Sequence, residues 1–317
     1  MPRFGEMEVS LASEQVGAWR LRLNLDSGWG FEGGHSENKG LSPGGAVIAV
    51  PEHRHKVEVD LWRAEFVAAY TFTENWDAWL RLPFERKIRT ASIELVEPAT
   101  QAEQDAMERN LLIHHASATL EGLSDPSLLA ATRSTGLFTE NDVVAFAFGT
   151  SIPLGQTEEN PYLLGDAGEA HEHMQFGTGT FTPLLEAFYV TPISEDTSFS
   201  VSLVGKAPLY ENSKGYKGST EVSAGVNLLH SLDPNWRVRV GWSSFYQDFA
   251  KWDGGRDPNS GLISHGATMG VTYDLGKDWD LSLDLRLPIS QRALDGHSDT
   301  YEHGPMVRLG LSRSIGP

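Results

Sequence analysis

The sequence contains no cysteine, which excludes disulfide bridges and thiolate chemistry. It is also poor in basic residues, because 25 Lys and Arg stand against 43 Asp and Glu and give a net charge of −18. A nucleic-acid partner is therefore not expected, since phosphates attract basic surfaces. No apolar run approaches the roughly 20 residues that a membrane-spanning helix needs. A soluble protein, or a membrane protein that crosses with strands, remains open.

The stretch 277–288 has a strictly alternating sequence. Its apolar residues are Trp279, Leu281, Leu283, Leu285 and Leu287, and the intervening positions are Asp280, Ser282, Asp284, Arg286 and Pro288. Alternation with a period of two places these sets on opposite faces of a β-strand. A soluble sheet would bury the leucine face, whereas a membrane barrel would turn it to lipid and turn the charges to a lumen.

The same alternation recurs along the chain and predicts twelve strands. Their expected ranges are about 17–26, 56–72, 76–89, 126–134, 142–153, 178–190, 198–209, 219–231, 236–249, 264–275, 279–289 and 305–315. Short acidic turns alternate with long connections, as in outer-membrane barrels, where the turns are periplasmic and the loops extracellular. We therefore expect an all-β fold, a single 12-stranded antiparallel transmembrane β-barrel over residues 1–317. A water-soluble double sheet is the alternative.

Local features refine this prediction. Trp76, Trp236 and Trp279 directly follow short turns and are expected to form an aromatic girdle at the periplasmic interface. The apolar face changes parity between Leu61 and Ala64, which predicts a β-bulge near Trp62. The glycine-rich residues 28–55 are expected to be a loop. A short loop helix is predicted over about 98–112, and it is a candidate to fold inward as a plug.

The predicted barrel implies a location in the bacterial outer membrane, with the lipid bilayer and lipopolysaccharide as partners. The start Met-Pro-Arg-Phe-Gly-Glu has no apolar core of a signal peptide. For an exported protein, we expect that the sequence represents the mature form with an added initiating methionine.

Four short motifs resemble a broad group of bacterial outer-membrane transporters linked to the meta-pathway of phenol degradation. They are Gly122-Leu-Ser-Asp-Pro126, Gly149-Thr-Ser-Ile-Pro-Leu-Gly155, Gln175-Phe-Gly-Thr-Gly-Thr180 and Leu285-Arg-Leu-Pro-Ile-Ser-Gln-Arg292. The resemblance covers roughly residues 57–314 and implies passive transport of a small, hydrophobic molecule. The chain departs from the usual terminal aromatic residue, because it ends in Ser314-Ile-Gly-Pro317.

Charged residues of both signs fall on the predicted lumen face. The candidates for a solute path are Arg20, Arg22, Asp77, Arg81, Arg133, Lys206, Glu221, Arg237, Arg239, Asp280, Asp284, Arg286 and Arg308. A ladder of arginines in a narrow pore would select anionic solutes. The alternative is an internal ion-pair network that fills and rigidifies the barrel. Twelve strands lie between small filled barrels and open 16-stranded porins, so we expect a narrow or plugged lumen.

Ten of the eleven histidines lie at or beside the long connections, and only His230 lies near a short turn. The pattern His-x-His places two imidazoles on one side of an extended chain. The candidate metal ligands are His53, His55, His171, His173, His297 and His303. Imidazole with carboxylate neighbours suits Cu²⁺, Zn²⁺ or Ni²⁺. The alternatives are polar loops without a specific metal, or carboxylates that hold the cations bridging lipopolysaccharide. No other cofactor is expected.

An enzyme is the third functional alternative. His115-Ala-Ser117 is similar to the His-x-Ser spacing of an outer-membrane phospholipase, although the residues that follow differ from that family. No orienting third group is identifiable. We therefore expect a channel or transporter that passes a small solute through a narrow charged lumen, rather than an enzyme.

Overall fold

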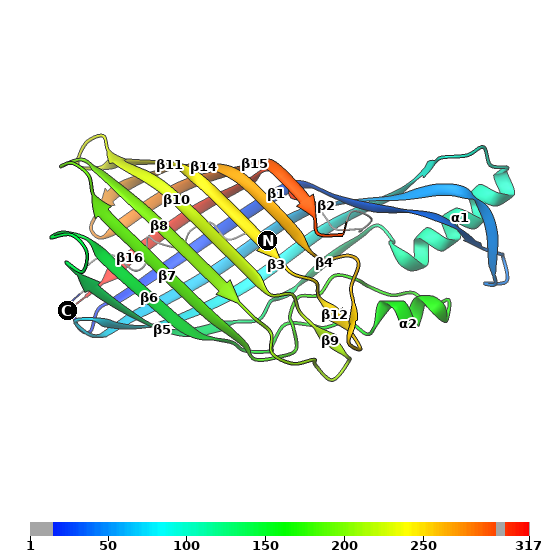
Figure 1. Ribbon diagram of the computed structural model, residues 1–317, viewed down its shortest axis with the longest axis horizontal. Helices are drawn as coiled ribbons and strands as arrows, with labels where there is room; N and C mark the ends of the chain where they lie inside the picture. The colour runs from blue at the N-terminus through cyan, green and yellow to red at the C-terminus, as the bar shows by residue number, and fades with distance from the viewer. Residues whose placement is uncertain (1–14, 296–301, 317) are drawn as a thin grey trace.

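The structure, a computed structural model, describes residues 15–295 and 302–316. Its main sheet closes on itself as an antiparallel barrel (Figure 1). The wall consists of β1 (Trp19–Leu41), β2 (Val47–Thr73), β3 (Trp76–Leu95), β4 (Ala118–Leu123), β5 (Ser127–Thr135), β6 (Val143–Ser151), β7 (Thr182–Pro192), β8 (Thr197–Lys206), β10 (Glu221–Ser231), β11 (Trp236–Gln247), β14 (Leu262–Gly276), β15 (Trp279–Ala293) and β16 (Met306–Ile315). Because β4 and β5 pair in succession with β3, they fill one position. The predicted twelve-stranded antiparallel barrel is confirmed.

The alternating leucines form an outward belt around the barrel. Leu283 on β15 lies opposite Leu309 on β16, which lies opposite Leu25 on β1. Their exposed fractions are 48%, 42% and 47%. So large an apolar exposure is costly in water but favourable against hydrocarbon, where burial of each square ångström contributes about 25 cal/mol. The outer surface is therefore that of a membrane barrel.

Aromatic residues mark the barrel end that carries the short hairpin turns, here called the turn end. Trp19 packs on Tyr70 with ring centroids 4.8 Å apart, and Trp236 packs on Tyr273 at 4.5 Å. Indole rings prefer the headgroup level of a membrane. By the rule for outer-membrane barrels, the turn end is periplasmic and the opposite end, the loop end, is extracellular.

The expected loop over 28–55 is wrong, because β1 and β2 continue as paired strands beyond the barrel wall (Figure 1). They turn at residues 42–46, where the Ala46 amide donates to the Ser42 hydroxyl at 3.0 Å. Glycine supports this pairing instead of preventing it. A Cβ on Gly34 would lie 2.2 Å from the His55 carbonyl oxygen, so a side chain would separate the strands.

The predicted β-bulge lies in β1 instead of near Trp62 in β2. β2 pairs with β3 without a register shift from His53 to Thr71, whereas the β1–β2 register shifts between Gly28 and Phe31. Val57 and Val59 therefore point inward, where they are buried against Phe31. The parity change in the sequence reflects apolar side chains inside the barrel, not a bulge.

The helix predicted over 98–112 is α1 (Gln101–His114). It begins after Thr100, which forms a capping box with Glu103, and Pro98 precedes the cap. Its buried Ala106 and Met107 pack against Val50 on the β1–β2 extension. The helix lies beyond the barrel (Figure 1). The expected inward plug is therefore wrong for this helix.

Smaller elements cover the loop end. They are α2 (Pro161–Asp166) and a three-stranded sheet of β9 (Tyr216–Lys217), β12 (Lys251–Trp252) and β13 (Gly255–Arg256). None of these was predicted, because such short segments carry no periodic pattern. Among the described residues, no helix is long and apolar enough to cross a membrane.

Asp125 joins three of the four sequence motifs noted above. Its carboxylate accepts hydrogen bonds from the amides of Gly155 at 2.9 Å and Thr178 at 2.7 Å. Asp125 lies in the break between β4 and β5. A Cβ on Gly177 would lie 2.3 Å from its Oδ1, so glycine permits the close approach. β7 begins at Thr182, four residues later than predicted.

Candidate functional site

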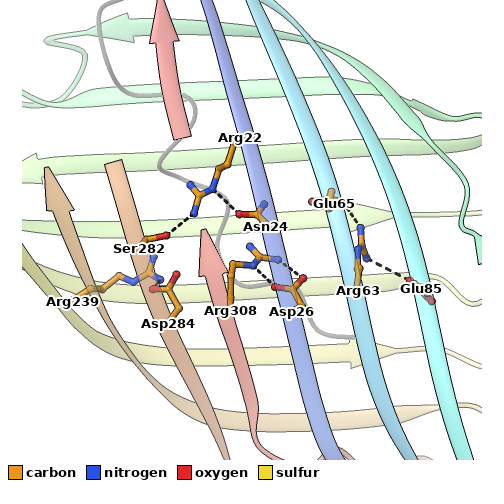
Figure 2. Close-up of polar contacts among 10 residues, drawn as sticks. All are labelled: Arg22, Asn24, Asp26, Arg63, Glu65, Glu85, Arg239, Ser282, Asp284 and Arg308. Atoms are coloured by element: carbon orange, nitrogen blue, oxygen red, sulfur yellow. Dashed lines mark hydrogen bonds and ion pairs between the residues drawn. The ribbon is translucent and has the colours of Figure 1, made fainter. Parts of the chain in front are cut away.

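The lumen contains a belt of buried charged side chains at mid-height (Figure 2). Arg308 on β16 donates two hydrogen bonds to Asp26 on β1, at 2.5 and 3.0 Å. Arg22 donates to Asn24 at 2.7 Å and to Ser282 at 3.1 Å. These side chains point inward because they occupy the positions that alternate with the outward leucines.

Further ion pairs extend the belt to other strands. Arg81 on β3 forms a two-point contact with Glu186 on β7, with distances of 2.6 and 2.9 Å. Arg239 on β11 pairs with Asp284 on β15. Figure 2 shows that Arg63 on β2 also pairs with Glu65 on the same strand and with Glu85 on the neighbouring strand β3. Paired burial of this kind avoids the large cost of an isolated buried charge.

The half of the lumen that is lined by β2 to β8 also contains an apolar cluster. Trp79 on β3 and Phe188 on β7 are each 1% exposed and belong to a cluster of inward residues from β2 to β8. Small residues such as Ala145 and Ala147 make room for the two rings. The Arg81 guanidinium lies 5.3 Å from the Trp79 ring centroid and connects the apolar cluster to the charged belt.

The charged belt and the apolar cluster together fill the barrel at mid-height. Arg81, Glu186 and Asp26 are 3%, 0% and 3% exposed, so water reaches almost none of their surface. A wide aqueous pore would leave such charged side chains exposed, as in the larger porins. The lumen is therefore closed by side chains in this conformation.

A cavity of about 300 Å³ lies on the loop-end side of the belt. One part of its lining is apolar and includes Phe31, Val59 and Met174. The remainder is polar, and its charged members are Arg63, Glu85, Lys87, Lys206 and Glu221. We call this cavity the loop-end chamber. Its volume lies at the lower end of the usual range for small-molecule sites.

A second cavity, of about 360 Å³, lies at the turn end and is lined by Arg20, Arg237 and Asp280 among others. It contains charges of both signs, because Glu195 and Asp196 also contribute. The charged belt thus has a chamber on each side.

All thirteen residues predicted for the lumen lie on its inner face, but they lie in different parts of it. Lys206 and Glu221 line the loop-end chamber, and Arg20, Arg237 and Asp280 line the turn-end cavity. The others are buried in the interior: Arg22, Asp77, Arg81, Arg133, Arg239, Asp284, Arg286 and Arg308. Their part in solute passage stays a prediction.

Arg286 differs from the other belt arginines in its partners. It is 1% exposed and donates to the hydroxyls of Ser243 at 2.9 Å and Ser264 at 3.0 Å. Within the described residues, no ion pair joins it to a carboxylate, and its Nη1 has no hydrogen-bond partner. Arg286 therefore adds positive charge to the interior that the ion pairs do not balance.

Sequence reasoning missed Arg63 and Lys87, which also line the loop-end chamber. Arg63 has the same strand parity as Glu65, and Lys87 has the same parity as Arg81, so alternation alone could have found both. The bulge assumed near Trp62 obscured the face of Arg63. The apolar Phe31 and Val59 had no comparable signal, because apolar residues were assigned to lipid.

The histidines predicted to bind metal fall into two groups. His53, His55, His171 and His173 lie together beyond the barrel at the loop end, in contact with His35, His114 and His115. His303 lies apart from them, between Phe31 and Phe245 on the chamber wall, and its role as a metal ligand stays a prediction. His297 lies outside the described residues.

Burial lowers the pKa of several imidazoles in this cluster. It lowers the pKa of His55 to about 3, with a smaller contribution from the nearby His35. Burial likewise lowers the pKa of His114 to about 4 and that of His173 to about 3, and both also lie near His171. These side chains are therefore neutral at pH 7 and keep a lone pair on one ring nitrogen.

The His115-Ala-Ser117 segment is not arranged as a catalytic pair within the described residues. The Ser117 hydroxyl accepts a hydrogen bond from the Ala91 amide at 3.0 Å. The His115 ring stacks on His173 with centroids 5.3 Å apart. No hydrogen bond joins the two side chains, which a nucleophile and its base require.

The closed barrel, the outward leucine belt and the charged interior define the fold of an outer-membrane β-barrel. The chain aligns over 99% of its length with the whole COG4313 outer-membrane channel from Pseudomonas putida F1, with a TM-score of 0.63 and 11% identity. At this identity the likeness shows the fold. No family profile matches the chain, and no curated protein matches it.

Two other solved structures align less well. The NanC porin covers 92% of this chain with a TM-score of 0.43 and 7% identity, and all of that porin is covered. The toluene transporter TodX from Pseudomonas putida covers 98% of this chain and is itself covered to 91%, with a TM-score of 0.40 and 11% identity. The barrel fold that the motifs imply is confirmed by the COG4313 channel, and no comparison links the chain to the phenol pathway.

Proposed function

We propose that the protein is an outer-membrane channel for small amphipathic anions, which enter through the loop-end chamber. The observation that supports this most directly is the position of the chamber, immediately on the loop-end side of the charged belt. A chamber with one apolar wall and one charged wall suits a solute that has an apolar body and an ionised group. The lipid bilayer and lipopolysaccharide are the surroundings that the outer-membrane barrel implies.

The balance of charge favours an anionic solute over a cationic one. The chamber lining contains three cationic side chains, Arg63, Lys87 and Lys206, against two carboxylates, Glu85 and Glu221. Lys206 pairs with Glu221 at 3.1 Å, and Lys87 lies 3.5 Å from Glu85. Beyond them, the buried Arg286 donates hydrogen bonds to the hydroxyls of Ser243 and Ser264. An anion that passes the chamber thus approaches a site of unbalanced positive charge.

Passage requires the belt to rearrange, because its side chains fill the lumen. The belt arginines can exchange partners, since each pair joins side chains that lie near other charged or hydroxyl groups of the belt. A solute carboxylate can replace a protein carboxylate on an arginine with little loss of hydrogen bonding. The barrel wall itself can stay unchanged during this exchange.

Flux into proteoliposomes tests the proposal. Swelling with an aromatic carboxylate should be faster than swelling with a neutral sugar of similar size. Lys206→Met should reduce the carboxylate flux severalfold and leave the sugar flux unchanged. Lys251→Met is the matched control, because Lys251 is exposed in the loop strand β12. Equal flux of carboxylate and sugar in the parent protein would contradict the proposed selectivity.

A further inference from the structure

Seven histidines gather beyond the barrel at the loop end, outside the path discussed above. They come from four separate segments: His35 on β1, His53 and His55 on β2, His114 and His115 at the end of α1, and His171 and His173 in the segment after α2. Their rings form a continuous chain of contacts, with neighbouring centroids 4.7–6.2 Å apart. The β1–β2 extension and α1 bring them together.

Two groups of three have the geometry of metal ligands. Ring nitrogens of His35, His55 and His115 all lie within 4.8 Å of one another, and so do those of His114, His171 and His173. A tetrahedral Zn²⁺ with bonds of about 2.0–2.1 Å holds its ligand nitrogens about 3.3 Å apart. Small movements of the imidazole rings are sufficient to bring the nitrogens from their present separations to this ligand spacing.

The hydrogen bonds of His53 prepare His55 as a ligand. The Nδ1 of His53 lies 3.1 Å from the Pro51 carbonyl oxygen, which can only accept, so this nitrogen carries the proton. The Nε2 of His53 then accepts from the Nε2 of His55, 3.2 Å away. This leaves the lone pair of His55 on Nδ1. That atom is buried and has no hydrogen-bond partner among the described residues.

In the second group, hydrogen bonding likewise orients a ring nitrogen for metal binding. The Nδ1 of His171 donates to the Glu169 carbonyl oxygen at 2.9 Å, so its lone pair is on Nε2. Gly165 on α2 lies against the rings of His114 and His171, and a Cβ there would be 3.1 Å from the nearer ring. A carbonyl contact on one ring nitrogen is the usual means of orienting the other toward a metal.

The same segment leaves a second buried ring nitrogen without a partner, the Nε2 of His173. Its Nδ1 lies 3.2 Å from the side-chain amide of Asn259. The Oδ1 of Asn259 is likewise buried and unpaired in the described part of the chain. Rotation of this amide would let Oδ1 accept from Nδ1 and would leave the lone pair of His173 on Nε2. An unpaired buried polar atom is destabilising, and a bound metal removes that cost.

We propose that each group of three histidines binds one transition-metal ion of the Cu²⁺ or Zn²⁺ type. Six imidazoles, without a thiolate and without a carboxylate in either group, match borderline metals and not Mg²⁺ or Ca²⁺. His53 is then a positioning residue for His55. Each ion keeps a coordination position that water can fill, as at three-histidine zinc sites.

The two ions would cross-link segments that lie far apart in the sequence. The first group joins β1, β2 and the end of α1, and the second joins α1 to residues 171–173. Met174 follows directly and lines the loop-end chamber. Metal binding should therefore fix the segment that separates the histidines from the chamber.

Metal titration of the refolded protein, prepared without a polyhistidine tag and treated with chelator, tests this inference. Calorimetry with Zn²⁺ and with Cu²⁺ should give two ions per chain. His35→Gln with His115→Gln should remove one ion, and His114→Gln with His171→Gln should remove the other. His53→Gln should keep the stoichiometry and weaken one site by about tenfold to a hundredfold.

The control is the double variant His230→Gln with His265→Gln, which removes two histidines outside the cluster. Heat-modifiable migration in gels checks that every variant folds as a barrel. Cu²⁺ electron paramagnetic resonance of the parent should show nitrogen hyperfine splitting from imidazole. The inference is overturned if the parent binds fewer than two ions, or if either paired variant keeps both.

Discussion

Asp26 and Arg308 lie 282 positions apart in the sequence, yet they form a two-point ion pair across β1 and β16 inside the barrel. β1 is the first strand and β16 the last, so the pair lies across the seam where the barrel closes. The same contact is part of the belt that fills the lumen. One interaction thus contributes both to closure of the sheet and to the packing of side chains in the lumen.

Removal of one partner of this pair should destabilise the barrel strongly. Asp26→Ala leaves the Arg308 guanidinium buried without its carboxylate, which we expect to cost roughly 3–5 kcal/mol in the free energy of unfolding. The double variant with Arg308→Ala should cost less than the sum of the single variants, because no unpaired charge remains. Urea unfolding in lipid vesicles, followed by tryptophan fluorescence, measures the four free energies. Additive costs would show that the two side chains do not interact.

The two faces of β15 should respond differently to substitution. Leu283→Arg places a charge in hydrocarbon near the membrane midplane and should cost roughly 2–4 kcal/mol. Ser282 faces the lumen and accepts a hydrogen bond from Arg22, so Ser282→Ala should cost about 1–3 kcal/mol. Leu283→Ile is the matched control for the outer face. The assignment of faces fails if Leu283→Arg is tolerated as well as Leu283→Ile.

Asp125 should hold the loop-end segments in place. Asp125→Ala removes the acceptor of the Gly155 and Thr178 amides, and hydrogen bonds to a charged group contribute about 1.5–3 kcal/mol each. We expect faster cleavage within residues 154–180 in limited proteolysis, with little effect on the strands. Asp248→Ala serves as control, because the exposed Asp248 accepts only from the next amide. Equal cleavage of the two variants would argue against a special role for Asp125.

Much of the barrel could be predicted from the sequence, because alternation with a period of two is a local signal. The leucines of 279–289 and the turn tryptophans needed no tertiary information. The extension of β1 and β2 could not be predicted in this way, since Gly33, Gly34 and Gly40 resemble loop residues until they are paired. Val57 and Val59 misled the prediction because an apolar side chain has the same appearance in sequence whether it faces lipid or packs inside the barrel.

The candidate sites depended more strongly on tertiary structure. Alternation placed Asp26, Arg81 and Arg308 on the inner face, but it could not show that they pair and fill the lumen. The histidine cluster combines segments as distant as His35 and His173, and only the packing of α1 on the extension brings them together. His303 likewise lies in a long connection of the sequence, and only the tertiary structure places it on the chamber wall.

The most direct measurement is single-channel conductance in planar bilayers, with the parent protein compared with the double variant Asp26→Ala with Arg308→Ala. If the belt is the barrier, the parent should conduct little, and the double variant should conduct severalfold more, because both side chains leave the lumen. Arg86→Ala with Glu121→Ala is the control, since that ion pair is exposed. Equal conductance of the parent and the double variant would contradict a path closed by the belt.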